Sequence, residues 1–170
     1  FARWEEILSE PEPHAPFAFA RAIWHYGRGV AYASMENKES ALKELAAIER
    51  LEREVDEIFM GNVYPAKSLI GIAKSLLRGE IAFRSGAMAA AVTSFEQAVA
   101  MQDALPYTEP PFWYYPTRQS LGAALLADGR AAEAQLVFEA DLEQYPMNGW
   151  SLYGLTEALK RAPPCCAVGR

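Results

Sequence analysis

Apolar residues recur three and four positions apart along most of the chain. This spacing extends from Ala20 to Arg53 and again from Leu69 to Met101, and apolar and polar residues alternate only over short runs. A three-and-four spacing places apolar side chains on one face of an α-helix, whereas sustained alternation is typical of a β-strand. The pattern therefore predicts an all-α fold.

Residues that favour turns divide the helical pattern into segments. Proline, glycine and asparagine gather near residues 10–16, 36–37, 61–65, 106–116 and 146–149. Gly86 and Gly129 each follow one apolar segment and precede another, where glycine can end a helix in the left-handed conformation without a Cβ clash. The predicted unit of organisation is therefore a helical hairpin.

Three hairpins share one skeleton of small and large residues. The matching positions are a small residue in the first helix, a glycine in the turn, and an alanine and an aromatic residue in the second helix. They are Gly79, Gly86, Ala91 and Phe95 in the second hairpin, and Gly122, Gly129, Ala134 and Phe138 in the third, with Pro146 after it. The first hairpin has Gly29 and Ala41, and Glu36 beside Asn37 takes the place of the turn glycine.

This skeleton resembles the tetratricopeptide repeat, a helical hairpin of about 34 residues. The resemblance covers about residues 20–160 and implies a right-handed superhelical solenoid, similar to the end region of bacterial multi-repeat proteins. It implies a single domain over residues 1–170. Its expected parts are a partial repeat at 1–16, repeats at about 20–53, 69–105 and 115–148, a partial capping helix at 149–161 and a tail at 162–170. Insertions are expected at 54–71 and 106–114.

Both ends of the chain read as incomplete repeats. Residues 2–8 resemble the opening of a second helix whose first helix is missing, and Pro163-Pro164 stops a helix from following residues 149–161. An incomplete repeat exposes apolar surface that normally receives its neighbour. The residues expected to pack against a neighbouring helix or a second molecule are Trp4, Ile7 and Leu8.

The charge balance excludes two classes of partner. The chain has 16 Lys and Arg against 22 Asp and Glu, which leaves a net charge of −6. It therefore lacks the positive field that holds nucleic acid or anionic lipid. No stretch approaches the ~18 uninterrupted apolar residues of a membrane span. We expect a soluble protein that binds no nucleic acid and does not insert into a membrane.

Residues that ligate metals are few and scattered. His14 lies in a proline-rich loop, His25 lies on a predicted helix, and Cys165-Cys166 is a neighbouring pair near the C-terminus. A zinc site needs three or four ligands at workable spacing. The sequence therefore predicts no metal and no cofactor, and gives the histidines surface or capping roles. The cysteine pair leaves a soft-metal site or an intermolecular disulfide open.

Catalytic motifs are equally scarce. The chain lacks a Gly-x-Ser-x-Gly elbow, and its only cysteines lie at the C-terminus. Acidic neighbours such as Asp56 and Glu57 point in different directions on a helix. Gly27 and Gly29 begin like a phosphate-binding fingerprint, but the third glycine and a preceding β-strand are missing from the pattern. We therefore expect that the protein is not an enzyme.

The family resemblance also implies a groove. In this family the first helix of each hairpin lines the inner curve of the superhelix, and interface hot spots favour tyrosine, tryptophan and arginine. The candidate groove residues are Tyr26, Glu80, Arg84, Gln119, Trp150 and Tyr153. Glu80 and Arg84 are four apart on one helix face, so pairing with each other is the alternative to a role in binding. Some family members bind a partner's C-terminal carboxylates with hydrogen-bond donors at fixed repeat positions. The corresponding residues of this chain lack those donors, so the resemblance does not imply this kind of binding.

The densest group of rings lies in residues 106–116, which hold five aromatic residues and four prolines. Proline restricts the backbone and lowers the entropy that is lost on ordering. Rings on such a frame either bury against the helices or present a recognition surface. We expect burial of most of them and leave a ligand-facing role open for one or two.

These observations favour a non-catalytic module that binds a protein or an extended peptide along the inner face of a helical solenoid. The alternative is a structural role, in which the incomplete terminal repeats self-associate into a homo-oligomer. An enzyme-associated or metal-handling role is a third hypothesis, because a fold does not determine its sites.

Overall fold

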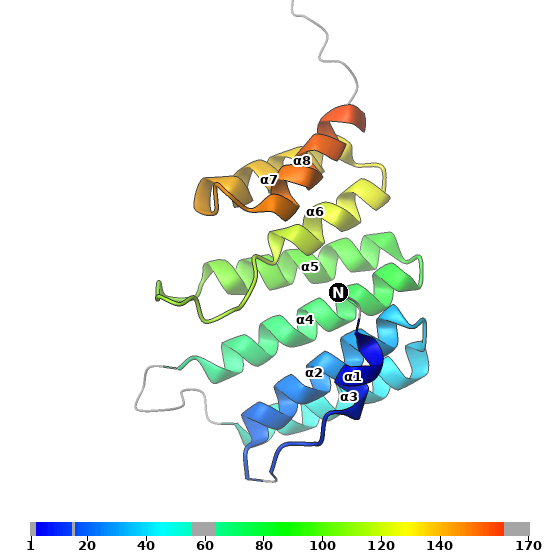
Figure 1. Ribbon diagram of the computed structural model, residues 1–170, viewed down its shortest axis with the longest axis vertical. Helices are drawn as coiled ribbons and strands as arrows, with labels where there is room; N and C mark the ends of the chain where they lie inside the picture. Colours follow the sequence, from blue (N-terminus) through cyan, green and yellow to red (C-terminus); the bar gives the residue numbers. More distant parts are fainter. Residues whose placement is uncertain (1–2, 15, 56–63, 162–170) are drawn as a thin grey trace, which may run out of the picture. The chain divides into compact units, whose positions relative to one another are not determined.

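The protein is all-helical, as the pattern of apolar residues predicts (Figure 1). The computed structural model describes residues 3–14, 16–55 and 64–161. Its helices are α1 (Trp4–Ser9), α2 (Ala18–Ser34), α3 (Lys38–Leu51), the 3₁₀ helix η1 (Glu52–Glu54), α4 (Ala66–Arg84), α5 (Met88–Asp103), α6 (Arg118–Ala127), α7 (Ala131–Gln144) and α8 (Gly149–Arg161). The expected all-α class is confirmed. Part of the expected insertion at 54–71 and the expected tail, with Cys165 and Cys166, lie outside the described residues.

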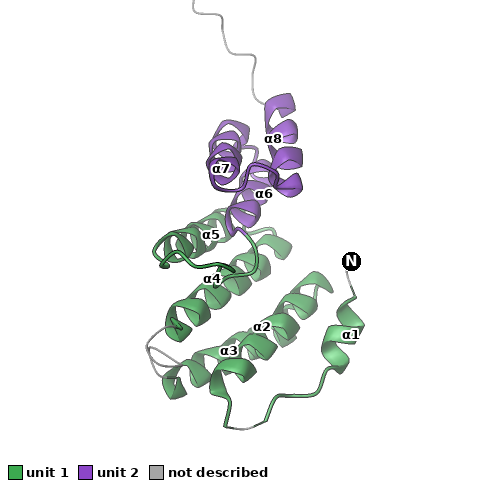
Figure 2. Ribbon diagram, turned by 60° about the vertical axis from the view of Figure 1, so that its left-hand side comes forward, with its two compact units in different colours: residues 1–115 green, residues 116–170 purple. Residues whose placement is uncertain are grey.

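The chain divides into two compact units (Figure 2). Unit 1 spans residues 1–115 and unit 2 spans residues 116–170. The boundary follows the proline-rich stretch and falls at the start of the expected third repeat. The sequence analysis expected one domain, and the structure shows two units.

Unit 1 consists of two helical hairpins and a short N-terminal helix. α2 packs along α3 and α4 packs along α5, while α4 also contacts α2 and α3. Apolar residues of these helices build the core, among them Leu45, Ile48, Ile72, Leu77 and Phe95. The helices of this unit bury their apolar stripes against one another, and this burial is the main favourable term in their packing.

The short helix α1 packs on α2. Ile7 lies against Gly27 of α2, and Trp4, Ile7 and Leu8 are all half-buried. The sequence analysis expected these three side chains to need a neighbour. In this structure their neighbour is a helix of the same chain.

Unit 2 contains one hairpin and a further helix. α6 packs along α7, and α8 packs on α7 and contacts α6. Its buried apolar residues include Leu121, Ala124, Leu125, Ala134 and Phe138. Pro146 lies in the turn between α7 and α8. In unit 2, α8 therefore packs on the preceding hairpin of α6 and α7. In unit 1, α4 packs in the same way on the preceding hairpin of α2 and α3.

All three hairpins close with the same turn. The turn residues Glu36, Gly86 and Gly129 have φ values of 61°, 74° and 78°. The N–H of the following residue then donates over 2.9 Å to the carbonyl five residues back, from Asn37 to Tyr32, from Ala87 to Ala82 and from Arg130 to Leu125. This is the Schellman closure of a helix C-terminus. Glu36 thus occupies the turn position that the sequence analysis assigned to it.

Glycines stand where helices approach most closely. A Cβ on Gly29 would lie 2.5 Å from Leu77 Cδ2, and a Cβ on Gly79 would overlap the Phe95 ring. Phe138 lies against both Gly122 of α6 and Gly154 of α8, where a Cβ would overlap its ring. The alanines of the shared skeleton, Ala41, Ala91 and Ala134, are fully buried. Small residues therefore set the spacing of the helices within each unit.

Residues Phe112–Tyr115 form an aromatic segment that folds back onto the first helices of unit 1. Trp113 is buried, and its ring centroid lies 5.7 Å from that of Tyr26 in α2. Phe112 packs edge-on against Tyr64, which precedes α4. The rings of Tyr107 and Tyr114 remain exposed. Burial thus occurs at Trp113, whereas a ligand-facing role for an exposed ring of this stretch stays a prediction.

Candidate functional site

A cavity of about 350 Å³ lies in unit 1 where α2 and α4 end. Its walls come from the last turns of both helices and from the turn that leads into α3. The lining residues are Ala33, Glu36, Lys38, Ile81, Arg84 and Ser85. One of them, Arg84, belongs to the candidate groove residues.

Charged side chains surround this cavity. Arg84 Nε donates to Glu80 Oε1 over 2.7 Å, and both side chains are partly exposed. Lys38 is exposed and forms no ion pair with any described residue. Ala33 and Ile81 add apolar surface beside these charges. The lining thus combines Arg84, which is paired with Glu80, with the ammonium group of Lys38, the carboxylate of Glu36 and an apolar wall.

Local hydrogen bonds hold the backbone around the cavity. Asn37 Oδ1 accepts from Ser40 N over 3.1 Å and caps the start of α3. Ser85 Oγ donates to Ile81 O over 2.7 Å at the end of α4. Because Lys38 is the first residue of α3, its backbone position follows directly from the capped turn.

Tyr26 does not belong to an open groove. Its side chain is only 6% exposed, because Trp113 covers it and the side chains of Tyr114 and Tyr115 hydrogen-bond to it. Burial, reinforced by these two tyrosines, raises the pKa of Tyr26 well above its ordinary value. The expectation that Tyr26 lines a groove is corrected, since the aromatic segment fills that face.

The remaining candidate groove residues lie in unit 2. Trp150 and Tyr153 lie three residues apart on α8 and are 72% and 67% exposed. Leu152 and Leu159 of the same helix are also exposed. Gln119 lies in the first turn of α6 and is half-buried. The helix α8 therefore presents four large apolar side chains at its surface.

A partly buried ionic network joins α2 to α1 and α3. Glu44 Oε2 lies 2.5 Å from His25 Nδ1, and Glu44 Oε1 accepts from Arg28 Nε over 3.0 Å. Arg28 Nη1 also donates to Leu8 O over 2.9 Å, and its guanidinium carbon lies 4.6 Å from the centroid of the Trp24 ring. Burial raises the pKa of Glu44, but hydrogen bonds from His25 and Arg28 outweigh burial and lower this pKa overall. The network gives His25 a structural role.

Metal ligation finds little support among the described residues. They contain no group of three or more His, Cys, Asp or Glu side chains that could hold a metal ion. His14 is exposed, and His25 is engaged with Glu44. The pair Cys165-Cys166 lies beyond residue 161, outside the described part of the chain.

Unit 2 contains a buried polar cluster that the sequence analysis missed. Asp141 of α7 is 1% exposed, and its Oδ2 accepts from Ser151 Oγ over 2.5 Å and from Asn148 Nδ2 over 2.6 Å. Asp141 Oδ1 has no hydrogen-bond partner among the described residues. Asn148 Oδ1 also accepts from Trp150 N. The cluster therefore holds the start of α8 against α7.

Comparisons with known proteins identify no relative of this chain. No family model, curated protein or solved structure matches the chain. In the part of the chain that the structure describes, no helix has both the length and the apolar character needed to cross a membrane. The features of the chain that indicate a function are therefore the cavity and the exposed faces of the helices.

Sequence reasoning found Arg84 but missed the neighbouring wall of the cavity. Lys38 follows the turn of the first hairpin, and Arg84 precedes the turn of the second. Turns of successive stacked hairpins lie at the same end, so these two cations share that end of unit 1. The alignment of the turns is the signal in the sequence that could have identified Lys38 as a neighbour of Arg84.

Proposed function

We propose that the chain is a non-catalytic binding module built from tetratricopeptide-like hairpins, arranged as a right-handed solenoid whose inner face binds a protein or an extended peptide. The shared turn geometry and the shared contacts of glycines with large apolar side chains support this proposal. Within each unit, the first helix of one hairpin also packs on the preceding hairpin. Hairpins that stack in this way offer a curved surface rather than a reaction centre.

The cavity at the ends of α2 and α4 is the observation that carries the proposal. Its lining includes the ammonium group of Lys38, the guanidinium group of Arg84 and the apolar side chain of Ile81. The two basic residues Lys38 and Arg84 outnumber Glu36 in the lining and favour an acidic group, and the apolar wall favours an apolar neighbour. We therefore propose a peptide segment in which an acidic residue stands next to an apolar one.

Peptide selection tests this proposal. A library of random short peptides is selected against the wild-type chain and counter-selected against a Lys38→Glu/Arg84→Glu double variant. We expect the retained peptides to be enriched in acidic residues and to bind less tightly as the salt concentration rises. Failure to enrich any peptide over the counter-selecting variant contradicts the proposal.

Calorimetry on single variants then measures the contribution of each charge. We expect Lys38→Ala and Arg84→Ala each to weaken a selected peptide about two- to fivefold, the range of a partly exposed charge pair. Lys67→Ala is the matched control, because Lys67 is also exposed but lies at the opposite end of α4. Equal affinity for wild type and all three variants would show that the peptide binds elsewhere.

A second candidate function is self-association through α8. In unit 1, each first helix is covered by the second helix of its hairpin, whereas α8 has no such partner among the described residues. Leu152 and Leu159 are 44% and 55% exposed on α8 as a result. An incomplete repeat buries such surface against a neighbour. We propose a second copy of the chain as that neighbour.

A further inference from the structure

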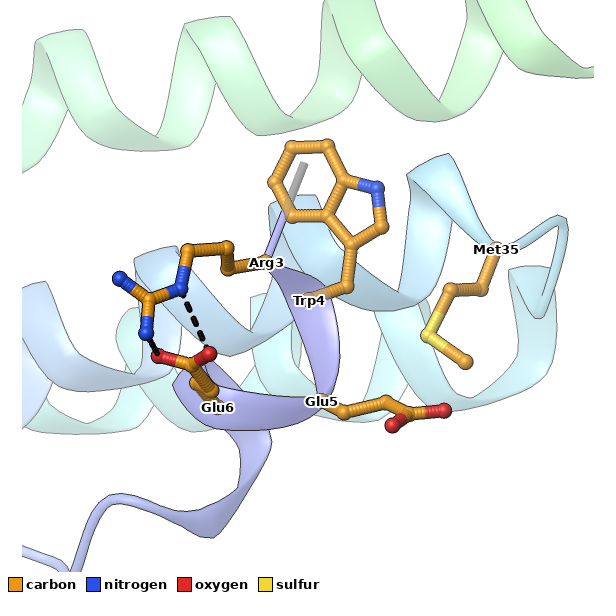
Figure 3. A pocket seen from close by; sticks show the side chains of 5 residues that line it. All are labelled: Arg3, Trp4, Glu5, Glu6 and Met35. Carbon is orange, nitrogen blue, oxygen red and sulfur yellow. Dashed lines mark hydrogen bonds and ion pairs between the residues drawn. The ribbon is translucent and has the colours of Figure 1, made fainter. Parts of the chain in front are cut away.

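A second cavity of unit 1 is bordered by α1 and by the end of α2 (Figure 3). Its volume is about 260 Å³. The lining residues are Arg3, Trp4, Glu5, Glu6 and Met35. In Figure 3, Arg3 and Glu6 lie together on one side of Trp4, and Glu5 and Met35 lie on the other.

Trp4 and Met35 supply the apolar part of this cavity. Trp4 is half-buried on a helix that packs on α2, so its ring is held in place while still bordering the cavity. Met35 caps the end of α2 and is 47% exposed. The face of an indole ring attracts cations more strongly than other aromatic rings, and a thioether adapts to the shape of its neighbour. The two side chains favour an elongated group that carries positive charge.

The acidic residues of the cavity favour the same kind of group. Arg3 and Glu6 compensate each other through two contacts of 2.6 Å and 2.5 Å. Glu5 is exposed and has no hydrogen bond or ion pair with any described residue. The lining therefore retains one negative charge, on Glu5, that no described residue compensates.

The same chain already shows this chemistry within its own fold. The guanidinium carbon of Arg28 lies 4.6 Å from the centroid of the Trp24 ring, and its Nε donates to Glu44. A tryptophan ring and a carboxylate there hold one cationic side chain between them. At the second cavity, Trp4 and Glu5 provide the ring and the carboxylate, and no described cation pairs with that carboxylate.

We propose that this cavity binds the cationic side chain of a basic peptide, an arginine or a lysine. Glu5 balances its charge, and Trp4 and Met35 pack against its apolar stem. The net charge of −6 draws a basic segment toward the chain. This inference is independent of the proposed function, because the two cavities share no residue.

Titration with a minimal peptide tests the inference. The probe is acetyl-Gly-Arg-Gly-amide, and its analogue with citrulline in place of arginine has the same shape without the charge. Binding is followed by NMR at the indole N–H of Trp4 and the methyl group of Met35, which Trp4→Phe and Met35→Leu assign. We expect the arginine peptide to shift both signals, with shifts that shrink as salt is added, and the citrulline peptide to shift neither.

Substitutions separate the contributions of charge and ring. We expect Glu5→Gln and Trp4→Leu each to weaken the arginine peptide about two- to fivefold. Trp4→Phe should give an intermediate affinity, because phenylalanine attracts cations less strongly than tryptophan. Glu96→Gln is the matched control for net charge, since Glu96 is exposed on α5 without a partner among the described residues, and its affinity should equal that of wild type.

Urea unfolding of each variant shows whether the fold is retained. Glu5 is exposed, so Glu5→Gln keeps the test decisive even if Trp4→Leu loosens α1. The inference is overturned if the citrulline peptide shifts the signals as strongly as the arginine peptide. It is equally overturned if Glu5→Gln binds like wild type or if the shifts arise away from Trp4 and Met35.

Discussion

Glu36 adopts a backbone conformation that glycine fills in the other two hairpins. Its φ of 61° matches the values of 74° at Gly86 and 78° at Gly129. A side chain in this left-handed region costs about 1 to 2 kcal/mol, because Cβ crowds the backbone. The hydrogen bonds of the turn are retained in spite of this cost. The first hairpin therefore stores strain at one residue of its turn.

We expect Glu36→Gly to stabilise unit 1. Relief of the strained conformation exceeds the added flexibility of glycine in the unfolded chain, so the free energy of unfolding should rise by about 0.5 to 1 kcal/mol. Urea unfolding of the wild type and the variant measures the difference.

The reverse substitution provides the control. Gly86→Ala should destabilise the protein by about 1 kcal/mol. A Cβ on Gly86 meets no atom within 4 Å, so this loss reports the backbone term alone. A destabilising Glu36→Gly would show that the glutamate side chain contributes contacts of its own.

At the scale of helices, Phe138 determines how α6, α7 and α8 meet. Its ring lies against Gly122 of α6 and Gly154 of α8, with no room for a Cβ at either glycine. The polar cluster at Asp141 holds the start of α8 beside the same surface. Packing at a single aromatic ring and hydrogen bonding at a single carboxylate together fix the place of α8 in unit 2.

We expect Gly154→Ala to destabilise unit 2 by about 1 to 3 kcal/mol, the usual cost of overpacking. The added methyl group overlaps the Phe138 ring, so a Gly154→Ala/Phe138→Leu double variant should lose less than the sum of the single losses. Thermal unfolding followed by circular dichroism measures these differences. Gly149→Ala is the control, because a Cβ there meets no atom within 4 Å. Additive losses in the double variant would contradict this account of α8.

At the scale of the whole molecule, the sequence predicts what depends on local pattern. The helices follow from apolar spacing, and the turns at Gly86 and Gly129 follow from a residue type that favours a positive φ. Burial of Tyr26 could not be predicted in this way, because Trp113 covers it from far along the chain. The absence of a described ion-pair partner for Lys38 also leaves no periodic signal. Packing between residues far apart in the sequence therefore accounts for much of what could not be predicted from the sequence.

Self-association is a property of the whole molecule that can be measured directly. If α8 binds a second copy, light scattering should show a mass that rises toward the dimer with concentration, because burial of apolar surface drives association. Leu152→Glu/Leu159→Glu should return the chain to a monomer. Leu136→Glu is the control, since Leu136 is also exposed in unit 2 but lies on α7. A wild-type chain that stays monomeric at high concentration contradicts this function.

The aromatic segment would limit the length of the peptide that we propose for unit 1. Tyr26 lies seven residues before Ala33, about 10 Å along the axis of α2. Because the chain's own rings cover Tyr26, the proposed peptide would contact unit 1 only at the cavity where α2 and α4 end. Complexes with small interfaces tend to dissociate quickly. On the proposed function, we therefore expect unit 1 to bind its peptides briefly, so that different peptides exchange at one short site.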